Sequence, residues 1–289
     1  MFRGKLINKK IINSTSVEEI KLHIKESIML KNSATIFIVF ILTVPLLAQE
    51  QSRESAAVDP TASQWSLQFA YEGQYDYKDT LAGNKGFFQF RFVAPLPADE
   101  NFPITLLPRL TARLVQNSQD EFGFGQSDLF VLGILNQWAS GRWGLGPQIN
   151  FPSQEGFGST NWGYGLAGAV TQRALNDDLF IALLLQQVWR DDGTGVVRAA
   201  PLGINATLVY QLGKGWYIGN GDFVIKYNWH NQTWFVPFGI RVGKAFINPN
   251  GTWNTYIEYR TWAIDDNWVG PVAEHNIRIN IQYQIPVSL

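Results

Sequence analysis

Apolar and polar residues alternate along most of the chain from residue 64 to its last residue. The segment 277–289 shows this most clearly, with isoleucine, tyrosine, valine and leucine at its odd positions and mainly polar residues at its even positions. A period of two is that of a β-strand with one apolar and one polar face. No segment after residue 48 has a convincing period of 3.6 residues, so we expect no long helix there.

Twelve such segments follow one another, separated by turn signals. The expected strands are 64–74, 86–94, 104–115, 127–136, 142–151, 161–171, 179–189, 201–211, 215–229, 233–246, 252–262 and 274–289. Pro108, Pro147 and Pro237 fall inside three of them. Because proline removes a donor from the hydrogen-bond ladder, we expect bulges beside these residues.

The connections between the expected strands alternate in length. QYDYKDTLAGNK, VQNSQDEFGFGQ, PSQEGFGST and RDDGTGVVRAA are long, QWASG, RALNDD, LGKG and NPNG are short, and HNQ departs from the order. Long loops at one end and tight turns at the other are typical of an up-and-down barrel. With both termini at the tight-turn end, the strand number is even. We expect the long loops to face outside and the short turns to face the periplasm.

Strands in a soluble β-sandwich also alternate, but composition favours a membrane. The polar positions carry glycine, asparagine, glutamine, threonine and scattered arginine, and only 16% of all residues are charged, against about 25% in soluble domains. The chain also has 11 tryptophans. A lipid core cannot satisfy backbone groups, so a sheet in a membrane must close on itself. The expected fold is all-β, a single up-and-down antiparallel transmembrane β-barrel of about twelve strands.

Tryptophan placement supports this fold. Indole rings prefer the headgroup level, and transmembrane barrels carry two aromatic girdles. The alternative is a tryptophan core in a soluble sandwich. The expected girdle residues are Trp138, Trp143, Trp216 and Trp253 beside the short turns and Trp162, Trp189, Trp229, Trp234 and Trp262 beside the long loops.

The first 48 residues differ from the rest. TIFIVFILTVPLLA (35–48) is the only long apolar run, with Lys31 before it and the small Ala48 at its end. Its apolar core of about 13 residues is shorter than the ~20 that a membrane helix needs. Residues 1–48 therefore have the features of a secretory signal peptide, cleaved near Ala48, and a start at Met29 would make it compact. The alternative is a single-pass anchor.

Residues 49–63 are small and polar and predict a flexible periplasmic leader, which leaves 64–289 as the barrel. Without residues 1–48 the chain has 16 basic and 21 acidic residues, a net charge of −5, which disfavours nucleic-acid binding. There is no cysteine, and His23, His230 and His275 lack metal-ligand spacing. We expect no metal and no cofactor. DDGTG (191–195) lacks the later glutamate of an EF-hand and predicts a plain turn.

Several stretches resemble a bacterial outer-membrane family assigned to the meta pathway of phenol degradation, whose members are often labelled "neuromedin U". The resembling stretches are FGQSDLFVLGILNQ (124–137), RWGLGPQINFPS (142–153), GSTNWGYGLAGAVTQ (158–172), QTWFVPFGIRVGKAF (232–246) and the last strand. The resemblance implies an outer-membrane barrel with a transport role and no established catalytic residues. The last strand also resembles the C-terminal signal that the barrel assembly machinery reads, with Leu289 in place of the usual phenylalanine.

The alternation assigns a set of charged residues to the lumen, where a basic excess would favour anionic solutes. These residues are Arg91, Arg109, Arg113, Asp128, Lys226, Arg241, Glu258, Arg260 and Arg278. They could instead pair with carboxylates and loop carbonyls as structural supports. Gly163, Gly165, Ala167 and Ala169 should also face inward and leave room along one wall.

We therefore expect a passive channel or transporter in the bacterial outer membrane, in contact with its lipid, for small solutes such as anionic or aromatic compounds. Two alternatives remain. One is a structural or adhesive barrel without transport. The other is an outer-membrane lipid hydrolase, which needs a serine beside a histidine such as His230 or His275 near the membrane rim; no strand serine is evidently paired with either.

Overall fold

The computed structural model describes residues 53–62, 64–78 and 83–287. The expected signal peptide (1–48), with Met29 and the alternative anchor, lies outside the described residues, as does Leu289. Within the described ranges, no helix is long and apolar enough to cross a membrane.

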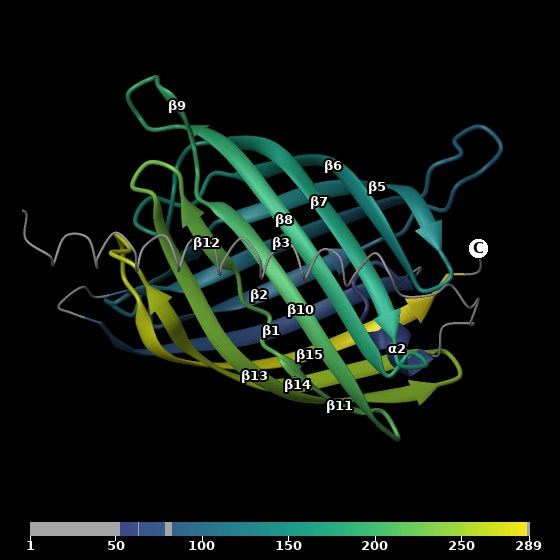
Figure 1. Ribbon diagram of the computed structural model, residues 1–289. Coiled ribbons are helices and arrows are strands. Elements are labelled where there is room, and N and C mark those ends of the chain that lie inside the picture. Colours follow the sequence, from purple (N-terminus) through teal and green to yellow (C-terminus); the bar gives the residue numbers. More distant parts are fainter. Residues whose placement is uncertain (1–52, 63, 79–82, 288–289) are drawn as a thin grey trace, which may run out of the picture. The chain divides into compact units, whose positions relative to one another are not determined.

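The strands form one sheet that closes on itself, because the first strand, β1 (Gln64–Tyr77), pairs with the last, β15 (Ala273–Pro286) (Figure 1). The strands between them are β2 (Gly86–Val93), β3 (Leu106–Gln116), β4 (Phe122–Phe124), β5 (Ser127–Trp138), β6 (Gly141–Phe151), β7 (Gly163–Ala174), β8 (Leu179–Asp191), β9 (Val197–Ala199), β10 (Leu202–Gly213), β11 (Trp216–Asn220), β12 (Ile225–Asn228), β13 (Thr233–Asn248) and β14 (Gly251–Asp265). All pairings are antiparallel.

The wall of the barrel has twelve strands, as the sequence predicted. The short strand β4 continues into β5, β9 continues into β10, and β11 and β12 are two pieces of one wall strand that pairs with β10 on one side and β13 on the other. The fold class predicted from the alternation is confirmed.

The outer face of the barrel is apolar and the inner face is polar. In β15, Ile277, Ile279 and Ile281 are 42–53% exposed, whereas Arg278 and Asn280 are at most 2% exposed. The cross-strand register agrees with this assignment, because the exposed Phe69 of β1 lies directly opposite the exposed Ile281 of β15. A soluble sandwich would bury these apolar residues, so that alternative is wrong. Hydrocarbon is the solvent that suits this exterior, and closure satisfies the backbone groups within it.

The expected girdle tryptophans are mostly exposed on the exterior near the strand ends. Seven of the nine are 39–50% exposed: Trp143, Trp162, Trp189, Trp216, Trp229, Trp234 and Trp253. The other two have closer partners. Trp138 donates from Nε1 to Gln172 Oε1 (2.8 Å), and the ring of Trp262 lies 5.1 Å from Lys78 Nζ.

The three prolines perturb the wall less evenly than the sequence predicted. A register shift lies between Val236 and Pro237, as expected. Pro108 and Pro147 stand within β3 and β6 in continuous pairing with β5 and β7, respectively. The larger irregularity lies at 221–224, where the single strand expected over 215–229 is interrupted between β11 and β12.

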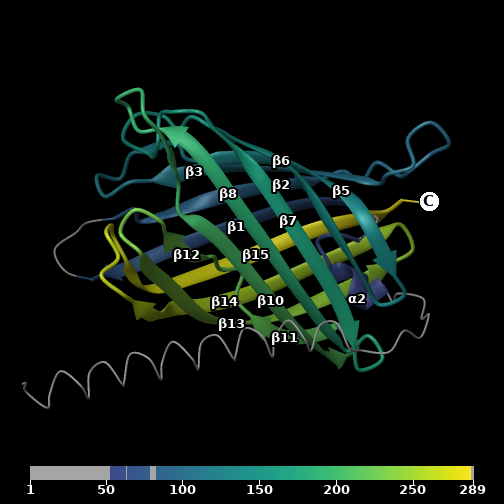
Figure 2. The same ribbon diagram turned by 45° about the horizontal axis from the view of Figure 1, so that its top comes forward.

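A short helix, α2 (Arg53–Val58), lies inside the barrel at the end where the C-terminal strand finishes (Figures 1 and 2). Its Ser55, Ala57 and Val58 are buried. This arrangement differs from the flexible leader that the sequence predicted for residues 49–63. The difference has a physical cause: the polar inner wall offers hydrogen-bond partners to a polar segment that has no apolar core of its own.

A charge placed on the lipid-facing belt tests the assignment of inside and outside. Ile279→Arg, at the middle of β15, is expected to lower the folding free energy in lipid vesicles by about 2–4 kcal/mol, because the charge enters hydrocarbon. Gln186→Arg, which directs the same charge into the lumen, is the matched control and should cost far less. Urea titration followed by heat-modifiable gel migration measures both. Equal losses in the two variants would contradict the assignment.

Candidate functional site

A wide vestibule of about 1040 Å³ opens at the long-loop end and extends into the barrel. Loop residues 158–161 and 191–193 line its rim, and residues from β1, β2, β3, β14 and β15 line its wall. The interior of a twelve-stranded barrel is too wide for side chains to fill completely. The vestibule is therefore the space through which a solute would approach the middle of the barrel.

The structure places all nine predicted lumen residues on the inner side of the wall. Seven line the vestibule: Arg91, Arg109, Arg113, Asp128, Lys226, Arg260 and Arg278. Arg241 lines a second cavity beneath it, and Glu258 is 1% exposed between the wall and residue 222. Gly163, Gly165, Ala167 and Ala169 lie on β7, and Ala167 is fully buried against Leu107, Phe130 and Leu132 rather than facing open space.

The interrupted wall strand brings a carboxylate into the lumen. Between β11 and β12 the chain leaves the sheet, and the Asp222 amide donates to Glu258 Oε2 (2.8 Å). Asn205 Nδ2 donates to Asp222 Oδ1 (3.1 Å). Gly221 permits this path, because a Cβ there would lie 2.4 Å from Glu258 Oε1. Phe223, in the same interruption, is buried, with 6% of its surface exposed.

Asp222 is the centre of a charged layer that crosses the lumen. It lies 3.3 Å from Arg91 Nη1 and 3.6 Å from Arg278 Nη2. Arg278 also reaches Glu72 (3.3 Å), which pairs in turn with Arg260. Three guanidinium groups are thus matched by Glu72, Asp222 and Glu258. For these arginines the structural role that the sequence left open is supported by the contacts.

Two further cations of this layer have no carboxylate within 4.0 Å among the described residues. The guanidinium of Arg109 stacks 4.2 Å from the Phe130 ring, and that of Arg241 lies 5.2 Å from the Tyr256 ring. The Nε atoms of both arginines are buried without a hydrogen-bond partner. Lys226 Nζ lies 5.9 Å from the Phe235 ring.

The charged layer and the lower vestibule carry a net positive charge. Arg113 is paired with Asp128 (3.8 Å) and donates to the Gln126 carbonyl. Seven basic side chains, namely Arg91, Arg109, Arg113, Lys226, Arg241, Arg260 and Arg278, therefore face four carboxylates, namely Glu72, Asp128, Asp222 and Glu258. An excess of three positive charges remains after every ion pair is counted.

Glu72 and Asp222 were not among the lumen residues predicted from the sequence. Glu72 could have been found, because it shares the inward register of Gln68 in β1. Asp222 had a weaker signal: it follows Gly219 and Gly221, and glycine inside a strand often marks a bulge or a close backbone approach.

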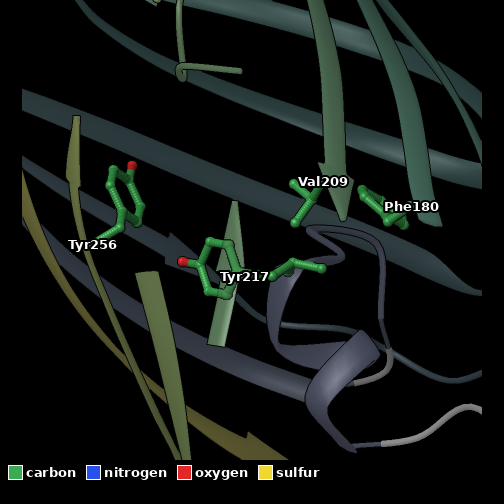
Figure 3. Close-up of a cluster of buried hydrophobic side chains, with 5 residues drawn as sticks. Phe180, Val209, Tyr217 and Tyr256 are labelled. Atoms are coloured by element: carbon green, nitrogen blue, oxygen red, sulfur yellow. The ribbon is translucent and has the colours of Figure 1, made fainter. Parts of the chain in front are cut away.

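Residues 53–62, here called the plug segment, close the short-turn end of the lumen. Two wall amides reach the Ala57 carbonyl, one from Asn254 (2.8 Å) and one from Gln284 (3.0 Å). Arg142 donates to the Thr61 carbonyl (3.0 Å). Val58 belongs to a buried apolar cluster with four wall residues, Phe180, Val209, Tyr217 and Tyr256, which Figure 3 labels.

The strongest contact of the plug segment is electrostatic. Asp59 is 2% exposed, pairs with Arg173 and lies 4.0 Å from Arg142. It also accepts hydrogen bonds from the amide (2.8 Å) and hydroxyl (2.6 Å) of Thr61. The sequence contained one unused signal for this contact: two inward arginines at the short-turn end with no acidic partner on their own strands.

The loop that follows β8 has the turn structure predicted for DDGTG. Asp191 Oδ1 accepts hydrogen bonds from the amides of Gly193 (2.6 Å) and Gly195 (3.1 Å). The hydroxyl and amide of Thr194, together with Arg198, hold the pKa of Asp192 well below its usual range. No group of three metal-ligating side chains is present in the ranges that the structure covers.

Comparison with known proteins gives a structural likeness. No protein-family model matches the chain, and no curated protein matches it. It is similar to the COG4313 outer membrane channel from Pseudomonas putida F1, with a TM-score of 0.54 and 16% sequence identity over 79% of this chain and 99% of that one.

Two weaker likenesses carry no further argument. They are to the KdgM porin (TM-score 0.45, 13% identity, 77% of this chain and 99% of that one) and to outer membrane phospholipase A from Escherichia coli (TM-score 0.44, 13% identity, 78% and 97%). At these identities the comparisons establish the fold, which is that of the bacterial outer-membrane β-barrels.

The buried pair of Asp59 predicts how firmly the plug segment is held. Asp59→Asn leaves Arg173 and Arg142 buried without a counter-charge, so docking of residues 53–62 should weaken by about 3 kcal/mol. Amide hydrogen exchange of these residues measures the change. Asp192→Asn, which removes a carboxylate from an exposed ion pair with Arg198, is the control and should leave that exchange unchanged. Unaltered protection in Asp59→Asn would contradict the electrostatic anchoring.

Proposed function

We propose that the chain is a passive channel for small solutes in the bacterial outer membrane. The observation that carries the proposal is the vestibule. Its open space of about 1040 Å³ extends from the long-loop end to the charged layer at mid-barrel. A purely structural barrel has no need for such a space, and its polar lining contrasts with the apolar exterior. The outer-membrane barrel fold supports the same conclusion.

The solutes that this lining favours are anions. Selectivity in pores is set by pore-lining charge and by the groups that replace water around the solute. The net excess of three positive charges is distributed over the wall from the vestibule to the charged layer, and it would raise the local concentration of anions. The space below the vestibule is a cavity of only about 110 Å³, which favours small solutes.

In the conformation described here the plug segment closes the short-turn end. Conduction therefore requires that residues 53–62 shift or leave the lumen. Their contacts are hydrogen bonds and one ion-pair cluster with the wall, together with a single apolar contact patch at Val58. Such polar contacts can be exchanged for water at moderate cost, which suits a removable closure.

We also propose that the chain belongs to the outer-membrane family of the phenol-degradation meta pathway. The stretches that carry the resemblance lie on β5, β6, β7, β13 and β15, on the wall rather than in the plug segment. The barrel assembly machinery and outer-membrane lipid are its proposed partners, the first through β15, which completes the barrel by pairing with β1. A signal peptide at residues 1–48 would bring it to the periplasm.

The geometry gives less support to a lipid hydrolase or an adhesive barrel. The His275 ring is hydrogen-bonded to the Tyr259 hydroxyl (2.7 Å), and the His230 amide donates to Asn228. A nucleophilic serine would need such a ring as its base. We propose no catalytic role for either histidine.

Removal of the plug segment tests the channel. A variant lacking residues 53–62 should let small solutes enter proteoliposomes faster than the intact chain, because the short-turn mouth opens. Solute-driven liposome swelling gives the rate, and heat-modifiable gel migration shows that the barrel is folded. A variant with the same ten residues replaced by a glycine–serine segment is the length-matched control. It should also admit small solutes faster than the intact chain. Folded barrels that stay impermeable in both variants would overturn the proposal.

Charge reversal in the vestibule tests the anion preference. Lys226→Glu lowers the net lumen charge from +3 to +1, so the reversal potential in a KCl gradient should shift toward cation selectivity. The shift is measured on the plug-deleted channel in planar bilayers. Lys244→Glu, on the outer face beside Trp216, is the control and should leave the potential unchanged. Equal shifts in the two variants would show that lumen charge does not set selectivity.

A further inference from the structure

A cavity of about 110 Å³ lies between the plug segment and the charged layer, and its two walls differ in chemistry. The wall formed by β3, β5, β7 and β8 is mainly apolar at this level, with Thr171 and the charged Arg109 as its polar exceptions. Its residues are Leu107, Phe130, Leu132, Ala169, Ala182 and Leu184. The wall formed by β1, β10, β14 and β15 is polar, with Gln68, Thr207, Asn254, Gln282 and Gln284.

The apolar wall is unusual for the inside of a membrane barrel. Lumen-facing positions of such barrels are normally polar, because they contact water. Leu107, Phe130 and Leu132 are each only 3% exposed and pack against one another rather than against lipid. An apolar surface that lines a solute path favours a solute with an apolar part.

Three arginines line the cavity, and of these only Arg91 is paired with a carboxylate, that of Asp222, among the described residues. Arg109 and Arg241 belong to β3 and β13, which are separated by four strands of the wall, so the two guanidinium groups approach the cavity from different sides. Both lack a carboxylate within 4.0 Å in the described part of the chain, and both have a buried Nε without a partner. The cross-strand neighbour of Arg241, Glu258, bonds instead to the Asp222 amide.

Unpaired buried guanidinium groups are costly, and a carboxylate is the group that they match best. We propose that this cavity is a binding site for a small amphipathic monocarboxylate. Its carboxylate would accept hydrogen bonds from Arg109 and Arg241, and its apolar body would lie on Leu107, Leu132 and the Phe130 ring. The site deepens the proposed channel function and rests on it, because the ligand enters from the vestibule, which shares Arg91, Arg109 and Asp222 with the cavity.

Size and charge limit the ligand further. An apolar cavity of roughly 150 Å³ holds a benzene molecule, and this cavity is smaller, at about 110 Å³, but continues into the vestibule. One six-membered ring or a short acyl chain is therefore the upper limit for the apolar body of the ligand. Asp222 also lines the cavity, and it repels a second negative charge on the ligand. An inorganic anion would gain nothing from the apolar wall. A single carboxylate on a compact apolar body satisfies all three conditions.

Calorimetric titration of the detergent-solubilised full chain with benzoate tests the site. Benzoate should bind at least about tenfold more tightly than its neutral analogue benzyl alcohol, because charge-assisted hydrogen bonds are lost in the analogue. The affinity for benzoate should also exceed the affinities for acetate and for inorganic phosphate, which lack the apolar body. Equal binding of benzyl alcohol or of phosphate would overturn the proposal.

Variants that remove positive charge locate the ligand. The double variant Arg109→Gln/Arg241→Gln should lose about tenfold or more in benzoate affinity. Lys244→Gln removes one positive charge from the outer face of the barrel, beside Trp216, and not from the lumen. It should leave the affinity within about twofold, because a distant charge on the outer face is screened. Retained affinity in the folded double variant would overturn the site.

Swelling of proteoliposomes by the same preparations separates the two proposals. Plug-deleted barrels that pass small solutes while the intact chain fails to bind benzoate would remove the binding site and leave the channel. Benzoate binding that depends on Arg109 and Arg241, in barrels that stay impermeable after plug deletion, would support the site and remove the channel function. Heat-modifiable migration of each variant confirms that a loss of binding is not a loss of folding.

Discussion

The pairing of β1 with β15 is the constraint on which the rest of the structure depends. Hydrocarbon offers no hydrogen bonds to backbone groups, so a sheet with free edges would leave a row of unsatisfied donors and acceptors in lipid. The ladder between these strands runs from Gln64 opposite Pro286 to Tyr77 opposite Ala273. Its register directs every second residue of the last strand inward. One pairing therefore fixes both the lipid-facing belt and the polar wall.

A closed polar wall creates a second problem, because it encloses charges that neither bulk water nor lipid can solvate fully. The solution is a network of matched groups. Asp222 lies between Arg91 and Arg278, and Glu72 lies between Arg278 and Arg260. These contacts join β1, β2, β14 and β15 to the inward-folded segment at 221–224. Breaking such a network would leave uncompensated buried charge, which is more costly than the loss of an exposed pair.

The wall could be predicted from the sequence because its determinants are local. The period-two pattern, the turn residues and the alternating loop lengths act within about ten residues of each other, and they gave the twelve strands and the inward placement of residues such as Arg109 and Arg278. The contents of the lumen could not be predicted in this way. The plug segment (RESAAVDPTA) has the composition of a flexible linker, and its order comes from wall residues as distant as Asn254 and Gln284.

The two segments that the alternation failed to predict have the same electrostatic role. The wall strands carry more inward arginines than inward carboxylates, and the missing counter-charges come from chain that is not part of the ladder. Asp222 reaches Arg91 and Arg278 from the break in a wall strand, and Asp59 reaches Arg173 and Arg142 from the plug segment.

The second of these counter-charges is the one that can leave. If the plug segment moves out, Asp59 leaves with it, while Arg142 and Arg173 stay on β6 and β7 at the short-turn mouth. The basic lining would then extend from the vestibule through the charged layer to the exit. In the proposed channel, opening and anion preference would therefore be coupled through one carboxylate, because the movement that clears the lumen would also expose two guanidinium groups along the path of the solute.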